Sequence, residues 1–168
     1  INYPANWLRL STAQEKTDLG ITEVADAPTY DSRFYWGDGT AKTLTDTNEV
    51  DENGDPLLDD NGNQVVTKGL KSIYKEQIKK QASSLLAPTD WMVVRYAEDN
   101  TKAIPSDVTT YRASVRTKAD EICTAIDGCT SMAKLKALFE STYNEDGDLD
   151  TIAKMQDFPT NDIKEYER

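Results

Sequence analysis

Apolar residues recur at steps of three and four positions along two long stretches in the second half of the chain. The first stretch is interspersed with lysines and followed by Pro88, so it predicts an amphipathic helix over about residues 69–86. The second opens at Pro105-Ser106, ends at Gly128 and predicts a longer helix. The apolar positions are Leu70, Ile73, Tyr74, Ile78, Ala82, Leu85 and Leu86 in the first stretch and Val108, Tyr111, Val115, Ile122 and Ile126 in the second. We expect the two stripes to pack within the chain, and a self-associating coiled coil is the alternative for the first.

Two further helices are predicted between and after these stretches. Thr89-Asp90 is a capping signal for a short helix, and we expect its Trp91 to lie in the core. Thr130 or Ser131 can cap a last helix. The inner side of that last helix would consist of Met132, Leu135, Leu138 and Phe139.

The first part of the chain has shorter apolar runs. Thr12 and Glu15 stand at the spacing of a capping box and predict a helix over about residues 12–19. Alternating apolar and polar residues at 21–24 predict a half-buried strand. The strand formers at 32–36 predict another strand, which ends at a Gly-Asp-Gly turn.

Residues 46–64 contain two Asn-Gly turns, at 53–54 and 61–62. Asn-Gly between short apolar runs is a strong hairpin signal, because both residues accept a positive φ. The apolar pairs at 57–58 and 65–66 would then form the arms of a small β-ribbon that projects from the body. A disordered acidic linker is the competing interpretation.

Together these elements predict an α+β fold, with short N-terminal strands and a β-ribbon followed by a C-terminal bundle of three or four helices. The expected domains are a strand- and turn-rich part at 1–66, which includes the acidic hairpin or linker at 46–66, a helical domain at 67–143, and an acidic C-terminal tail at 144–168.

Charge narrows the classes of partner. The 168 residues include 30 acidic and 19 basic side chains, which gives a net charge of −11. Binding to DNA, RNA or an anionic membrane needs a basic face, so we expect neither nucleic acid nor membrane as a partner. Acidity that merely keeps the protein soluble explains the same balance. Ile1 begins the chain without an initiator methionine or a signal-peptide pattern, so we expect that residues have been removed or that the chain belongs to a longer one.

The candidate chemistry is sparse. With no histidine, Ser–His and Cys–His nucleophile pairs and histidine-ligated metals are impossible. Oxygen-bearing side chains at 51, 53 and 55 and at 146, 148 and 150 alternate like calcium ligands. The sixth position, where an EF-hand loop needs glycine, is Pro56 in the first run and Thr151 in the second, so we expect solvated turns. Cys123 and Cys129 are expected to be free, buried thiols, because two cysteines in 168 residues make no disulfide framework. The flanking Glu121 and Asp127 disfavour a redox switch. We therefore predict no catalytic, cofactor-binding or metal-binding residue.

The residues predicted to contact a partner are Phe34, Tyr35, Trp36, Leu57 and Leu58. Adjacent rings in a strand point to opposite faces, so one face can enter the core while the other is left for a partner. Packing of all three rings in the core is the alternative. Leu57 and Leu58 belong to the predicted ribbon.

A resemblance to a known family rests on the run 85–95, Leu-Leu-Ala-Pro-Thr-Asp-Trp-Met-Val-Val-Arg, followed by Ala-Ile-Pro at 103–105 and Thr-Tyr-Arg-Ala-Ser-Val-Arg at 110–116. This pattern resembles a domain of bacteriophage tail proteins, of the tail-assembly-chaperone-like and tail-fibre-associated kind. The resemblance covers about residues 50–140 and brings no catalytic residues with it.

What the resemblance implies is a role in the virion or in its assembly. We expect a tail- or tail-fibre-associated virion protein, assembled in the host cytoplasm, that binds other phage structural proteins or acts as an adaptor. A homo-oligomer is expected, since tail parts assemble with rotational symmetry. The alternative is a cytoplasmic tail-fibre assembly chaperone that is absent from the mature virion. An enzyme that uses carboxylates or lysine is the least favoured class.

Overall fold

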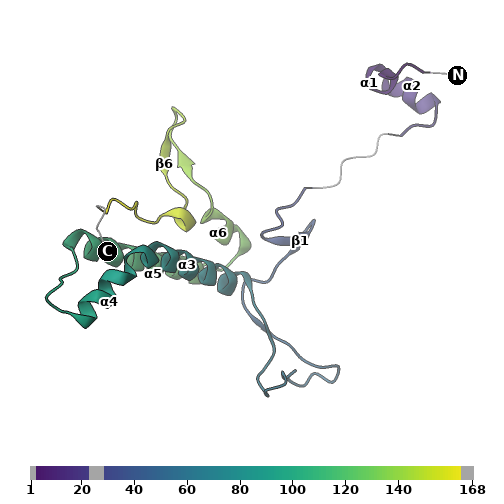
Figure 1. Ribbon diagram of the computed structural model, residues 1–168. Helices are drawn as coiled ribbons and strands as arrows, with labels where there is room; N and C mark the ends of the chain where they lie inside the picture. Colours follow the sequence, from purple (N-terminus) through teal and green to yellow (C-terminus); the bar gives the residue numbers. More distant parts are fainter. Residues whose placement is uncertain (1–2, 23–28, 164–168) are drawn as a thin grey trace. The chain divides into compact units, whose positions relative to one another are not determined.

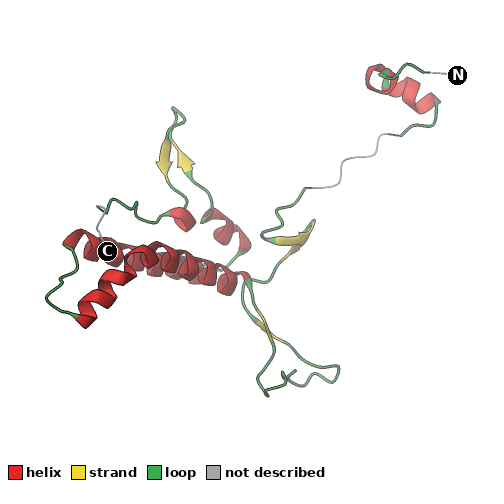
Figure 2. Ribbon diagram, in the orientation of Figure 1, coloured by secondary structure: helices red, strands yellow, loops and turns green. Residues whose placement is uncertain are grey.

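The computed structural model describes residues 3–22 and 29–163, and the chain divides into two compact units, residues 1–30 and 31–168. Figure 1 follows the chain by colour and Figure 2 shows its secondary structure. The division lies well before the domain boundary predicted at 66/67, because Phe34 packs on Tyr74 and Phe139, and residues 43–46 are hydrogen-bonded to the start of the following helix.

The first unit contains two short helices, α1 (Trp7–Leu10) and α2 (Ala13–Asp18). The Thr12 hydroxyl accepts the Glu15 N–H at 3.3 Å, and the Glu15 carboxylate accepts the Thr12 N–H at 2.8 Å, which completes the capping box. The helix predicted at 12–19 is therefore confirmed. Of the strand predicted at 21–24, the first two residues are not in a strand, and the other two lie outside the described residues.

The core of the second unit is an antiparallel pair of helices, α3 (Leu70–Leu86) and α5 (Ser106–Asp127), which lie side by side in Figure 1. Both helices predicted from the apolar stripes are confirmed within one or two residues of their expected ends. The stripes face each other, as intramolecular packing requires. The buried positions in the pair are Leu70, Tyr74, Ile78 and Ala82 on α3 and Val108, Tyr111, Val115, Ala119, Ile122 and Ile126 on α5.

The helix predicted to stop at Pro88 does end there, since α3 stops at Leu86. Pro88 lies in a 3₁₀ turn, η1 (Ala87–Thr89), which leads directly into α4 (Asp90–Glu98). Proline fits this place because the first positions of a new turn need no N–H donor. The capping prediction was wrong: Thr89 occupies the N-cap position, but its hydroxyl donates to the Leu86 carbonyl at 2.9 Å. Trp91, expected in the core, is half-exposed under the Arg95 guanidinium.

After α5 the chain forms α6 (Met132–Ala137), a hairpin of β5 (Thr142–Tyr143) and β6 (Leu149–Thr151), and a 3₁₀ turn, η2 (Lys154–Gln156). Ser131 caps α6, as predicted, by accepting the Lys134 N–H. The predicted acidic tail returns to the core through Ala153 and Met155, which are buried.

An ion-pair network holds η2 against α5. Lys118 lies 2.9 Å from Asp157 and 3.3 Å from Glu121, and Lys154 lies 3.2 Å from Glu121 and 3.5 Å from Asp157. Each cation thus contacts both carboxylates, which lowers the pKa of Glu121 and Asp157 through hydrogen bonds from the lysines. The network fixes the C-terminal segment more through its geometry than through its energy, since all four groups are partly exposed.

The aromatic segment forms a small hairpin, β1 (Tyr35–Gly37) paired with β2 (Thr40–Ala41). A further pair, β3 (Thr47–Asn48) and β4 (Val66–Thr67), precedes α3. Helices and small antiparallel strand pairs confirm the α+β class. Within 3–22 and 29–163, no helix has the length and apolar character needed to cross a membrane.

Candidate protein-binding site: a forked β projection

Residues 47–67, which we call the fork, form three chain segments that meet at one point. The stalk is the β3–β4 pair, and each of the two fingers (50–56 and 58–64) begins and ends with an isolated bridge, Val50 to Pro56 and Leu58 to Gln64. The forked shape is visible below the helices in Figure 1. The ribbon interpretation is therefore confirmed in place of the disordered linker, although the projection has two fingers and not one.

A closed ring of backbone hydrogen bonds joins the three segments. The Glu49 N–H donates to the Val65 carbonyl at 2.9 Å, the Val65 N–H donates to the Leu57 carbonyl at 2.8 Å, and the Leu57 N–H donates to the Glu49 carbonyl at 3.0 Å. Each segment thus donates once and accepts once. The junction satisfies its own backbone groups without help from a hydrophobic core.

Gln64 fills the centre of this ring with its side-chain amide. Its Nε2 lies 2.6 Å from the Glu49 carbonyl oxygen, 3.1 Å from that of Leu57 and 3.0 Å from that of Val65. Two amide hydrogens are shared among three carbonyls, so the contacts are partly bifurcated. Sequence reasoning missed this residue, because a lone glutamine in a polar loop carries no signal of such a role.

The tips of the two fingers have the same turn geometry. In the first, the Asp51 carboxylate accepts the N–H of Asn53 at 2.8 Å and of Asp55 at 3.0 Å, while Gly54 has a φ of +87°. In the second, Asp59 accepts the N–H of Asn61 at 2.9 Å and of Asn63 at 2.8 Å, and Gly62 has a φ of +80°. Glycine takes this left-handed conformation without strain.

Both backbone hydrogen bonds in each turn go to one oxygen of the carboxylate, Oδ1. Backbone hydrogen bonds, first from Asp55 and Asn63 respectively, lower the pKa of Asp51 and Asp59. In the other acidic triplet, the turn is closed by Asn144 and not by an aspartate. Among the described residues, no group of three or more His, Cys, Asp or Glu side chains is placed to hold a metal ion.

Apolar side chains stand exposed along the fork. Val50 is 57% exposed, Leu57 41%, Leu58 54% and Val66 43%. They lie among acidic residues, and the sequence has no lysine or arginine between Lys42 and Lys68. The fork thus combines an ordered backbone, exposed aliphatic groups and negative charge.

The aromatic residues predicted as contacts divide between core and surface. Phe34 is 1% exposed and packs edge-on against Phe139, so it belongs to the core, and its assignment as a contact residue was wrong. Tyr35 is half-buried with Lys136 over its ring. Trp36 is 71% exposed and has the Lys42 ammonium 4.5 Å from its ring centre. Leu57 and Leu58 lie together in the fork, whereas Trp36 lies on the separate β1–β2 hairpin.

The fork is fastened to the start of α3. Leu70 and Lys71 donate their N–H groups to the carbonyls of Thr43 and Leu44, at 2.9 and 3.0 Å. The Asp46 carboxylate accepts the Ser72 hydroxyl at 2.9 Å and the Gly69 N–H at 2.8 Å, and these bonds lower its pKa. Two of the N–H groups that a helix start leaves unpaired are thus satisfied by the segment 43–46, which leads into the fork.

Four residues between positions 86 and 112 form one cluster. The Arg112 guanidinium donates to the Leu86 carbonyl at 2.9 Å and to the Thr89 hydroxyl at 2.7 Å, and it lies 2.8 Å from the Asp90 carboxylate. Arg112 therefore ties the turn between α3 and α4 to α5, which is a scaffold role.

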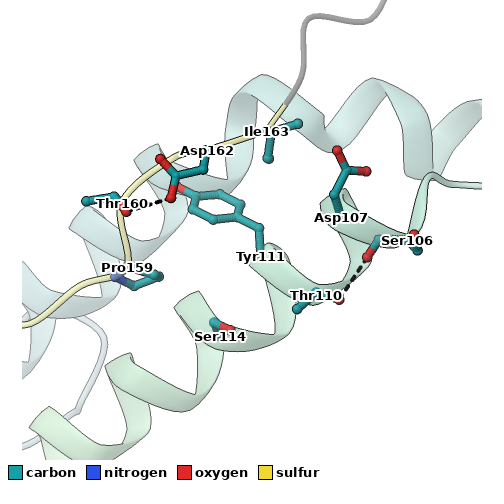
Figure 3. Close-up of a pocket in the computed structure, with 9 residues that line it drawn as sticks. All are labelled: Ser106, Asp107, Thr110, Tyr111, Ser114, Pro159, Thr160, Asp162 and Ile163. Carbon is teal, nitrogen blue, oxygen red and sulfur yellow. Dashed lines mark hydrogen bonds between the residues drawn. The ribbon is translucent and has the colours of Figure 1, made fainter.

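A polar groove lies between the first turns of α5 and the C-terminal segment (Figure 3), with a volume of about 490 Å³. Tyr111 forms part of its wall, and its hydroxyl is buried without a hydrogen-bond partner in the described structure. Burial raises the pKa of Tyr111, so the phenol stays protonated at neutral pH. The other lining residues are Ser106, Asp107, Thr110, Ser114, Pro159, Thr160, Asp162 and Ile163.

The two cysteines are free thiols. Cys129 is buried and Cys123 is half-buried, so the expectation of buried thiols holds fully for the first only. Burial raises the pKa of both, which keeps them protonated at neutral pH and disfavours redox chemistry.

In comparisons with known proteins, no family model, no curated protein and no solved structure matches the chain.

Proposed function

We propose that this chain is a bacteriophage tail- or tail-fibre-associated protein that works by binding other phage structural proteins, and that the fork is its principal contact element. The observation that carries the proposal is the set of exposed aliphatic side chains on a hydrogen-bonded β projection. A folded chain gains nothing by holding these groups in water, whereas a partner that covers them gains apolar burial.

The ordered backbone of the fork supports the same proposal. A contact element that is already ordered loses little conformational entropy on binding, so more of its apolar burial appears as affinity. The phage assignment itself comes from the resemblance around residues 85–116, whose residues build the scaffold and do not contact the proposed partner. Tail subunits bind one another in symmetric assemblies, so we also expect a homo-oligomer.

Mass spectrometry of purified phage particles tests the assignment. A tail component would be present in a fixed ratio to the other tail proteins. Its absence from particles, together with its presence in the producing cell, would favour the second candidate, a cytoplasmic tail-fibre assembly chaperone. The fork serves both functions, so this measurement separates them and does not test the fork.

The fork is tested by replacing its exposed leucines. We expect the double variant Leu57→Ser/Leu58→Ser to enter particles at least about tenfold less than the unchanged chain, because central apolar contacts dominate interface energies. The matched control is Leu8→Ser/Leu10→Ser, which removes two leucines that are 60% and 65% exposed in the first unit. Equal incorporation of both variants would refute the role of the fork.

A further inference from the structure

The β5–β6 hairpin ends in the same turn as the two fingers of the fork. The Asn144 side-chain oxygen accepts the N–H of Asp146 at 3.0 Å and of Asp148 at 2.8 Å. The Asn144 N–H donates to the Asp148 carbonyl at 2.9 Å, and Gly147 has a φ of +86°. All these features repeat what Asp51 and Asp59 do in the fork, so the molecule carries three copies of one finger, the third spanning residues 143–149.

The strand pairing around the three turns also matches. In each finger the residue before the turn faces the residue six positions later: Val50 with Pro56, Leu58 with Gln64, and Tyr143 with Leu149. The residue before the turn is apolar and exposed every time, to 57% for Val50, 54% for Leu58 and 64% for Tyr143. Three unrelated loops would not be expected to share turn, register and an exposed apolar group at one position.

The third finger is mounted on the core at its base. The Ala153 N–H donates to the Ser141 side chain at 2.9 Å, and the Met155 N–H donates to the Leu138 carbonyl at 3.0 Å. Ala153 and Met155 are themselves buried. The finger is therefore held at both ends by residues that belong to the core.

Charge indicates what would cover this finger. Acidic side chains surround it at positions 145, 146, 148 and 150, and the sequence has no lysine or arginine between Lys136 and Lys154. A second copy of the chain would bring its own acidic fingers to the contact, and like charges repel. On a partner with an apolar pocket surrounded by lysine or arginine side chains, the pocket would bury the Tyr143 ring and the cations would pair with the acidic side chains.

We propose that the third finger is a second docking element, equivalent to each finger of the fork, and that it binds a protein surface with an apolar pocket rimmed by basic side chains. The inference rests on the proposed role of the fork in protein binding. It adds a second site, which follows the helix pair in the sequence whereas the fork precedes it. It also adds the chemistry of the partner. Any self-association of the chain would then use another surface.

The experiment uses short random peptides selected for binding to the full chain. We expect the selected peptides to combine lysine or arginine with large apolar residues. The best peptide is then titrated into isotope-labelled full chain, and we expect backbone amide signals of residues 143–149 to shift together with those of the fork. Binding should weaken as salt is added, because the contact includes exposed opposite charges.

Variants separate the two sites. Tyr143→Ser should weaken the response at 143–149 by about tenfold or more and leave the fork response in place. Leu58→Ser should do the reverse, Leu149→Ser should repeat the effect of Tyr143→Ser, and Leu10→Ser should change neither response. Because all these side chains are exposed, unchanged signals from the core verify that each variant is folded.

The outcomes distinguish this inference from the proposed function. Peptide responses confined to the fork would overturn the third finger alone. Responses at no finger would overturn both. Selected peptides without basic residues, or finger signals that shift with protein concentration in the absence of peptide, would overturn the basic partner.

Discussion

The helix pair and the fork are ordered in opposite ways. The α3–α5 pair buries a continuous apolar stripe, and Ile122, Ile126 and Val115 are fully inaccessible to water. The fork has no buried residue and is held by backbone hydrogen bonds, side-chain amides and two glycine turns. Global stability should therefore reside in the helix pair, while the fork should open and close on its own at lower free energy.

The largest expected effect comes from a cavity in the helix pair. Ile122→Ala should lower the free energy of unfolding by about 3 kcal/mol, because it removes buried methyl groups and leaves a void. Urea unfolding followed by circular dichroism measures the loss. The control Ile152→Ala changes an isoleucine that is 42% exposed and should stay within about 0.5 kcal/mol of the unchanged chain. Similar losses in the two variants would contradict the location of the core.

A smaller loss is expected where the two regions meet. A Cβ on Gly69 would lie 2.4 Å from the backbone carbonyl of Thr45, so Gly69→Ala forces the segment around Thr45 away from the start of α3. We expect a loss of about 2 kcal/mol in urea unfolding, as for other overpacked sites. Gly128→Ala, whose nearest atom would be at an ordinary 3.5 Å, should be neutral or slightly stabilising. A neutral Gly69→Ala would show that the fork is not firmly attached.

The third change should affect the fork alone. Gln64→Glu places a carboxylate, which cannot donate a hydrogen bond when ionised, against three carbonyl oxygens. We expect hydrogen exchange of the Glu49, Leu57 and Val65 amides to accelerate by about tenfold, the scale of one lost hydrogen bond. The melting temperature should not change. Gln77→Glu adds the same charge on the exposed face of α3 and serves as the control.

The smallest expected effect is a pH dependence of the stability of the two finger turns in the fork. Hydrogen bonds hold the pKa of Asp51 and Asp59 below the ordinary value of 3.8, so their contribution to the finger turns is complete above that value. It should be lost as the pH falls through their lowered pKa. The protection of the finger-tip amides, taken as their exchange rate relative to the intrinsic rate at the same pH, should therefore fall in acid. The third finger uses Asn144, which does not titrate, and should show no such change through this group.

What could be predicted from the sequence followed from periodicity and turn chemistry. The helix pair was predictable because its stripes repeat over many residues. The turns and the ribbon character of residues 46–64 were predictable because Asn-Gly identifies a turn without any tertiary information, but the division into two fingers was not. The fold class followed from these elements. The helix pair was thus predicted from a signal that extends along the chain, and the turns of the fork from a signal within a few residues.

What could not be predicted depends on contacts between distant residues. The burial of Phe34 depends on Phe139, and the place of Thr89 depends on Arg112. Gln64 acquires its role only where three segments meet. The third finger did have a local signal, since Asn144 and Gly147 repeat the spacing of Asp51 and Gly54, but it was obscured by its place in an acidic tail.

The shared turn has a consequence for how recognition could change over generations. Counted from Asp51, Asp59 and Asn144, the defining hydrogen bonds of the three turns use the first, third, fourth and fifth positions. The side chain at the second position, Glu52, Asp60 or Glu145, takes no part in them. Substitutions there leave the hydrogen bonds of the turn in place. Under the proposed role in protein binding, single codon changes at this position would alter the preference of one finger while the other fingers retain the old one.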